Sequence, residues 1–167
     1  MRHIIPLLAA SLGLSACVLQ STEAQFGDAD ASLLFGNKPV TLALSGPDQS
    51  GLNLPATITA TPENYHYRLT PGGARSYFVP LGQDHYVVQL VQPGITSYAV
   101  ATGSASGLTL GRLDCARIKT DLRTNLLVEF KNNSCSLRAT DQPKADFVTL
   151  LSTAADLSPP LRLSPSP

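Results

Sequence analysis

The fold is decided by residues 65–100, which read YHYRLTPGGARSYFVPLGQDHYVVQLVQPGITSYAV. Apolar and polar side chains alternate along short runs in this stretch, so that Tyr67 and Leu69 alternate with His66 and Arg68. Turn-forming Gly and Pro residues separate the runs. Alternation with a period of two, broken by such turns, is typical of antiparallel strands and not of βαβ units. The sequence therefore predicts an antiparallel meander.

Two turns set the predicted pairing of the strands in this meander. A two-residue loop at Gly82-Gln83 would place Tyr77 opposite Val88 and gather the large apolar side chains on one face. For the next turn, at Pro93-Gly94, we expect a three-residue loop with a bulge, because a strict two-residue loop would send Tyr98 to the opposite face. The tyrosines serve either the core or a recognition surface, and the lack of Trp favours the core.

The rest of the chain extends the same pattern. Further strands are predicted around residues 40–44, 55–61, 108–110, 126–130 and 135–137, where apolar residues alternate between turn-forming residues. A helix is predicted from about 143 to 156, because Phe147, Leu150 and Leu151 recur at helical spacing. The predicted fold is mainly β: an antiparallel meander that forms a small sandwich or barrel, with one C-terminal helix packed on it.

Residues 1–17 carry a different signal. Arg2 and His3 precede an apolar run that ends in Leu14-Ser15-Ala16-Cys17. A charged start, a short apolar core and small residues before a cleavage point are typical of a secretory signal. The last four residues resemble the lipobox of bacterial lipoproteins. That resemblance implies removal of residues 1–16 and acylation of Cys17, and two or three acyl chains make such an anchor stable. An ordinary secretory signal with a chance cysteine is the alternative.

The same resemblance bears on location and partners. In enteric-type bacteria, Asp after the lipidated cysteine retains a lipoprotein at the inner membrane, and this chain has Val18 there. The resemblance thus implies an outer-membrane location facing the periplasm, whereas other lineages sort differently. The predicted partners are the membrane, through the lipid, and another envelope protein. Nucleic acid is not a predicted partner, because 12 Lys and Arg balance 12 Asp and Glu without a basic cluster.

Composition divides the chain that follows the signal into three parts. Residues 17–32 contain few large apolar side chains and are predicted to be a lipidated tether. Residues 33–157 are the predicted β-rich globular domain. Residues 158–167 are predicted to be an extended tail, because Pro159, Pro160 and Pro165 disfavour both helices and β-ladders.

Two cysteines remain once Cys17 carries lipid. An exported chain resides where disulfides persist, so Cys115 and Cys135 are predicted to form a structural bridge between neighbouring segments. A pair of buried thiols and a redox dithiol are the alternatives, and no Cys-x-x-Cys spacing supports the second.

Motifs that would support catalysis or metal binding are missing from the sequence. The closest match to Gly-x-Ser-x-Gly, residues 103–107, has Ala105 in place of the nucleophile. His66, His85 and Arg68 form a candidate binding surface on a solvated sheet face. A zinc site needs three or four ligands, and no third histidine is left once residues 1–16 are removed. We therefore predict no enzymatic activity, no metal and no cofactor.

The leading functional hypothesis is a lipid-anchored envelope protein that binds or scaffolds another envelope component. A carrier of a small apolar ligand inside a β-barrel is the alternative, by analogy with lipid-anchored lipocalins, although the chain has no Trp and so lacks their Gly-x-Trp motif. An envelope hydrolase, or an inhibitor of one, is the third hypothesis.

Overall fold

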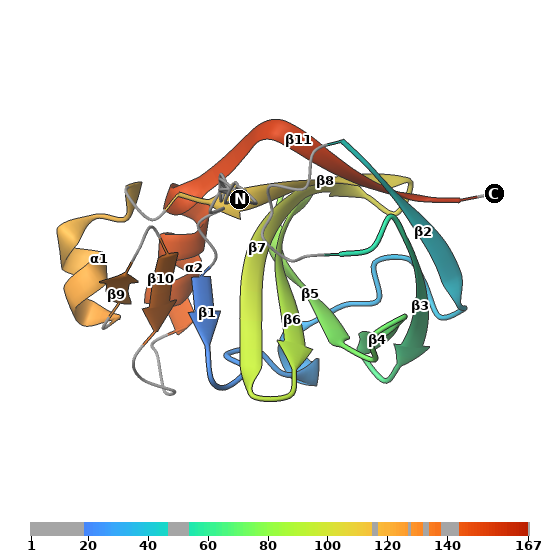
Figure 1. The fold of residues 1–167 in the computed structure, drawn as a ribbon, viewed down its shortest axis with the longest axis horizontal. Coiled ribbons are helices and arrows are strands. Elements are labelled where there is room, and N and C mark those ends of the chain that lie inside the picture. Colours follow the sequence, from blue (N-terminus) through green and yellow to red (C-terminus); the bar gives the residue numbers. More distant parts are fainter. Residues whose placement is uncertain are drawn as a thin grey trace, which may run out of the picture.

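The computed structural model describes residues 19–46, 54–114, 117–126, 128–131, 134–137 and 144–166. Over these ranges the chain is mainly β, and its strands form an antiparallel barrel with two helices at one side (Figure 1). The predicted mainly β fold is confirmed, and of the two architectures that the sequence left open the chain adopts the barrel. No helix among the described residues is long and apolar enough to span a membrane.

Eight strands follow one another around the barrel in chain order. They are β2 (Val40–Ser45), β3 (Thr57–Glu63), β4 (His66–Thr70), β5 (Arg75–Gly82), β6 (His85–Gln92), β7 (Ile95–Ser104), β8 (Gly107–Leu113) and β11 (Ala155–Pro165). From β2 to β8 each strand is antiparallel to the next. The final strand, β11, pairs with both β8 and β2 and thereby closes the ring.

A smaller layer extends from one wall of the barrel. The first residues of β7 pair with β1 (Leu19–Ser21), which lies parallel to β10 (Ser134–Leu137), and β10 pairs with β9 (Val128–Lys131). Two helices, α1 (Thr120–Asn125) and α2 (Lys144–Ala154), lie on this side of the barrel (Figure 1). This layer is built from the chain between β8 and β11, together with the N-terminal strand.

Two separate apolar cores hold these parts together. The barrel interior contains inward-facing side chains that include Leu42, Tyr67, Phe78, Leu90 and Leu163. The second core lies outside the barrel, where outward-facing side chains of β5, β6 and β7 meet β1 and both helices; it includes Leu19, Tyr77, Val79, Val87, Tyr98, Leu122, Phe147, Leu150 and Leu151. Strands that are buried on both faces carry apolar residues on both, which explains the adjacent Val87 and Val88.

The predicted C-terminal helix is confirmed as α2. Phe147, Leu150 and Leu151 are each at most 1% exposed and pack into the second core. Their spacing places them on one side of the helix, so the helix covers the outer wall of the barrel. The predicted start of the helix at Pro143 lies outside the described residues.

The hairpin between β5 and β6 differs from the prediction by one residue. Its loop is Gln83-Asp84, and both residues have positive φ angles, 49° and 59°. A type I′ turn requires this geometry at both central positions. One extra residue also bulges out of β5 just before the loop. Tyr77 consequently faces Gln89, and the predicted pairing with Val88 is wrong.

The turn between β6 and β7 is one residue shorter than predicted. Gln92 pairs directly with Ile95, so Pro93-Gly94 forms a strict two-residue loop without the expected bulge. Tyr98 consequently lies opposite Gln89. Because both turns differ from the prediction by one residue, the two changes cancel, and Tyr77 and Tyr98 still share a face of the sheet.

The predicted tether over residues 17–32 is wrong for the part that the structure describes. Leu19 is fully buried in β1, and Phe26 is buried in the second core. The short 3-10 helix η1 (Asp28–Asp30) follows, and the Ser32 amide donates to the Phe78 carbonyl over 2.9 Å. Residues 19–32 are therefore part of the folded domain.

The predicted tail over residues 158–167 is also wrong. Residues 155–165 form β11, and Leu161 and Leu163 are 2% and 3% exposed inside the barrel. The register of β11 against β8 shifts between Asp156 and Leu161, where the Pro159-Pro160 pair lies. Prolines lack an amide donor but are tolerated where a ladder is interrupted, so they do not prevent this segment from being a strand.

The segment before β9 also differs from the prediction. A strand was expected from residue 126, but Leu126 caps helix α1 and is fully buried, and β9 begins at Val128. A six-residue helix carries too few turns for its periodicity to be distinguished from a strand run.

Candidate functional site

The enclosed centre of the barrel interior is packed and leaves almost no free space. Its cavity has a volume of about 10 Å³, which is about that of one water molecule. Large side chains account for this: Phe35, Tyr67 and Phe78 form a cluster of aromatic rings with centroids 5.5 to 6.0 Å apart. The Tyr67 hydroxyl donates to the Gly36 carbonyl over 2.9 Å and fixes the cluster in place.

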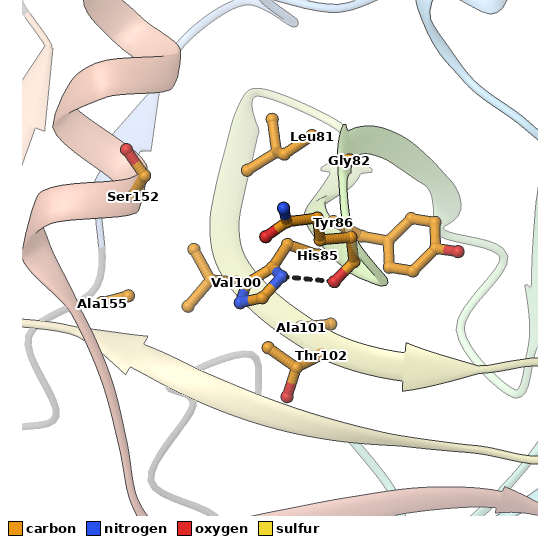
Figure 2. A pocket seen from close by; sticks show the side chains of 10 residues that line it. Leu81, Gly82, His85, Tyr86, Val100, Ala101, Thr102, Ser152 and Ala155 are labelled. Atoms are coloured by element: carbon orange, nitrogen blue, oxygen red, sulfur yellow. Dashed lines mark hydrogen bonds between the residues drawn. The ribbon is translucent and has the colours of Figure 1, made fainter.

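A much larger hollow lies at one end of the barrel, on its outer side. This hollow, which we call the end groove, has a volume of about 510 Å³. It lies between the β5–β6 hairpin, the second half of β7 and the junction of α2 with β11 (Figure 2). Its lining consists of Leu81, Gly82, Gln83, His85, Tyr86, Val100, Ala101, Thr102, Ser152 and Ala155. Ligand pockets in proteins commonly have this size and this mixture of many apolar and few polar groups.

His85 is the most chemically distinctive side chain in the end groove. Its Nδ1 lies 2.7 Å from the Gln83 carbonyl oxygen, which can only accept, so Nδ1 carries the proton. In the neutral ring Nε2 is then a hydrogen-bond acceptor. Figure 2 shows this second nitrogen turned toward Val100 and Ala155, away from the Tyr86 ring on the other side of the strand. The groove thus offers one acceptor beside an apolar wall.

A second hollow, of about 330 Å³, lies at the β4–β5 and β6–β7 turns, where it shares the core residues Ile58, Leu69 and Leu90 with the interior cavity. Its lining includes Leu54, Pro71 and Gln92 and contains no histidine, serine or charged side chain among the described residues. It offers size but little means of orienting a ligand, because specificity in pockets comes from a few placed polar groups. We therefore regard the end groove as the better candidate.

His66 lies in a different place from His85 and has a different role. It is 7% exposed, its ring stacks on Tyr77 with centroids 4.8 Å apart, and Nδ1 lies 2.9 Å from an Asp28 oxygen. Its Nε2 is buried without a hydrogen bond to any described residue, 3.7 Å from Glu63. His66 therefore joins η1 to β4, and the prediction of a solvated face is wrong for this residue.

Arg68 is exposed and forms a bidentate salt bridge with Glu63. Its Nε and Nη2 donate to the two carboxylate oxygens over 2.6 and 2.9 Å. This hydrogen bonding lowers the pKa of Glu63 and raises the pKa of Arg68. An exposed pair of this kind contributes little to stability. The structure thus separates the predicted binding surface: His66 and Arg68 both contact Glu63, whereas His85 lines the end groove.

The predicted lipidation and disulfide sites fall partly outside the described residues. Cys17 and Cys115 both lie there, and Cys135 is buried in the second core opposite Leu19. The acylation of Cys17 and the bridge between Cys115 and Cys135 stay predictions. Among the described residues, no group of three His, Cys, Asp or Glu side chains is placed to hold a metal ion.

Sequence reasoning missed a buried polar clamp on the outer wall. Gln89 on β6 is fully buried; its Oε1 accepts from the Gln25 and Phe26 amides over 2.9 and 3.0 Å, and its Nε2 donates to the Phe26 carbonyl over 2.8 Å. The neighbouring Tyr98 hydroxyl bonds Ser21 over 2.8 Å. A single polar residue within the apolar run 86–91 was the available signal, because such residues are buried only with partners.

Comparisons with known proteins identify no relative. Neither the family models, nor the curated proteins, nor the solved structures contain a match to this chain.

Proposed function

We propose that this protein is an exported, lipid-anchored component of the bacterial envelope that binds a partner in the end groove on the outside of its barrel. In this proposal Cys17 carries the lipid, the protein faces the periplasm from the outer membrane, and the barrel is a rigid scaffold. The proposed role is binding and not catalysis.

One observation carries this proposal: the enclosed centre of the barrel is filled, and the hollow that combines large volume with polar side chains lies outside it. The enclosed interior cavity has a volume of about 10 Å³, whereas the end groove has about 510 Å³. Small-molecule sites typically have 300 to about 1,000 Å³. The groove also combines an apolar wall with His85, Thr102 and Ser152, which are the kinds of polar groups that orient a bound molecule.

The anchor is tested by replacing the residue that would be acylated. Cells that produce the wild type or Cys17→Ser are grown with labelled palmitate, and membrane and soluble fractions are compared. We expect label and membrane retention for the wild type and neither for the variant, because two or more acyl chains are needed for stable anchoring. An unlabelled wild type would contradict the anchor.

The binding surface is tested by photocrosslinking in cells. A benzophenone amino acid is placed at Gln83, which is exposed in the end groove, and at Lys38, which is exposed outside it, as a matched control. We expect an adduct of defined mass from position 83 and none from position 38. Equal adducts from both positions, or from neither, would contradict binding in the groove.

The carrier hypothesis retains one supporting observation, which is that the chain does form a barrel with an apolar interior. A ligand that is enclosed beyond the 330 Å³ hollow requires the interior cavity to grow from about 10 Å³ to a few hundred, at the expense of core contacts. Native mass spectrometry of the protein purified from its own envelope distinguishes the two sites. A bound apolar molecule that survives blockage of the end groove would support the carrier.

A further inference from the structure

We infer that the end groove faces the membrane to which the protein is anchored and takes up an acyl chain of a bilayer lipid. This inference rests on the proposed function, because it requires acylation of Cys17 and binding in the groove. It adds the orientation of the barrel and the chemical class of the ligand.

The direction of β1 places the anchor at the groove end of the barrel. Leu19 pairs with Tyr98 and the strands are antiparallel, so the chain before Leu19 heads toward the side of β7 where Val100 lies. Val100 lines the end groove and shares the second core with Leu19. Two residues along a strand cover about 7 Å, so Leu19 lies about one such step from the level of Val100.

The link between anchor and barrel is short. Cys17 is separated from Leu19 by Val18 alone, and Leu19 is fully buried in the sheet. An extended chain spans at most about 3.6 Å per residue, so the acylated sulfur lies within about 10 Å of the Leu19 backbone even with its side chain extended. Because no long tether intervenes, acyl chains inserted in the bilayer hold this end of the barrel against the lipid surface.

The lining of the end groove suits an acyl chain better than a charged or sugar-like molecule. Leu81, Val100 and Ala155 form an apolar wall, and no Lys, Arg, Asp or Glu is among the described lining residues. Each methylene moved from water to such a wall contributes about 0.8 kcal/mol. The hydroxyl groups of Thr102 and Ser152 can donate hydrogen bonds to the ester oxygens at the end of the chain.

Photocrosslinking from the lipid side tests this inference. The purified, lipidated full chain is reconstituted into phosphatidylethanolamine and phosphatidylglycerol vesicles that contain a phospholipid with a diazirine on one acyl chain. After irradiation, adducts are mapped by peptide mass spectrometry. We expect them on segments 81–86, 100–102 and 152–155, whereas adducts confined to the opposite end of the barrel, around Pro93-Gly94, would overturn the inference.

Two variants on α2 provide a matched comparison. Ser152→Trp places a large ring in the groove, and Thr149→Trp places the same ring one turn earlier, outside the lining; both positions are exposed. We expect Ser152→Trp to lower the groove adducts about tenfold and Thr149→Trp to leave them unchanged. Equal adducts in the two variants would also overturn the inference.

The same samples separate the two possible failures. Retention of the protein on floated vesicles reports the anchor, independently of the groove. A chain that floats with the vesicles but shows no groove adducts contradicts the inference and leaves the anchor intact. A chain that does not float contradicts the proposed function itself.

Discussion

Gln89 and Tyr98 are neighbours across β6 and β7 on the outer wall of the barrel, and both are fully buried. Their polar atoms hold the N-terminal segment by its backbone, at Gln25 and Phe26, and by the Ser21 side chain. Burial of such groups costs free energy unless every donor and acceptor is paired. These two residues therefore make residues 19–32 part of the domain instead of a tether.

Loss of the Gln89 amide should destabilise the protein. Gln89→Leu leaves the Phe26 amide and carbonyl without their partners, and we expect a loss of about 2–4 kcal/mol in the free energy of unfolding. Urea denaturation measures the loss, and hydrogen exchange at Phe26 should accelerate. Gln92→Leu, at an exposed position at the end of β6, is the control and should be nearly neutral. Equal stability of the two variants would contradict the claim that the buried Gln89 amide holds the N-terminal segment.

Tyr98 should make the protein sensitive to alkali. Burial raises the pKa of Tyr98 to about 12 from its ordinary value of 10, so the fold favours the neutral phenol. The contribution of this buried phenol to the free energy of unfolding is fully present below pH 10 and is lost as the pH rises toward about 12. A shift of this size corresponds to roughly 3 kcal/mol.

The variant Tyr98→Phe isolates this effect. We expect it to lose about 1 kcal/mol at pH 8, because the bond to Ser21 is gone, but to lose less further stability between pH 10 and 12 than the wild type. Urea denaturation at the three pH values measures both quantities. If the stability of the two proteins fell in parallel across this range, ionisation of Tyr98 would not be the cause of the alkali sensitivity.

At the scale of elements, the tight turns of the meander set which faces of the strands meet which core. Gly103 near the end of β7 shows how close the backbones come: its φ is +133°, and a Cβ atom there would lie 2.3 Å from the Gly107 carbonyl oxygen. Only glycine fits both the conformation and the space. The hairpin from β7 into β8 therefore depends on this residue.

Substitution of this glycine should be costly. We expect Gly103→Ala to lower the free energy of unfolding by about 2–4 kcal/mol, through backbone strain and the clash with β8. Gly27→Ala is the matched control, because an added Cβ meets nothing within 4 Å there, and it should cost less than about 1 kcal/mol. Thermal unfolding followed by circular dichroism compares them; a tolerated Gly103→Ala would show that the hairpin is looser than described.

The alternation of residue types was enough to predict most strands, the helix α2 and the antiparallel order, because period and turn residues are local properties. Registers were not predicted, since Gly82-Gln83 and Gln83-Asp84 are both acceptable loops and only the packing of two cores selects one. The end groove could not be predicted from the sequence for a similar reason. His85 was singled out, but Val100 and Ser152 come to it from β7 and α2, and long-range packing alone brings them together.

At the scale of the whole molecule, the last strand decides whether the sheet is a barrel or an open meander. β11 provides Leu161 and Leu163 to the interior and pairs with β2 and β8 on its two sides. Closure leaves no free edge between β2 and β8, and open edges favour aggregation. A Pro-rich segment that composition predicts to be a tail is thus a structural strand.

Interior-facing and exterior-facing residues of β11 should respond differently to truncation. We expect Leu163→Ala to cost about 2–5 kcal/mol, because it leaves a cavity in the barrel interior. Arg162→Ala changes the exposed neighbour on the same strand and should stay within about 0.5 kcal/mol. Urea denaturation measures the free energy of unfolding of both variants. If residues 158–167 were a tail, neither substitution would change it.

Closure of the barrel by β11 is the central claim, because the filled interior, the end groove and the lipid-facing orientation all depend on it. The most direct test is an NMR measurement of nuclear Overhauser effects on the isotopically labelled chain. Closure predicts cross-strand contacts between residues 162–165 and 42–45, with Leu163 opposite Leu44. Random-coil chemical shifts for residues 158–166, with no contacts to β2, would contradict it.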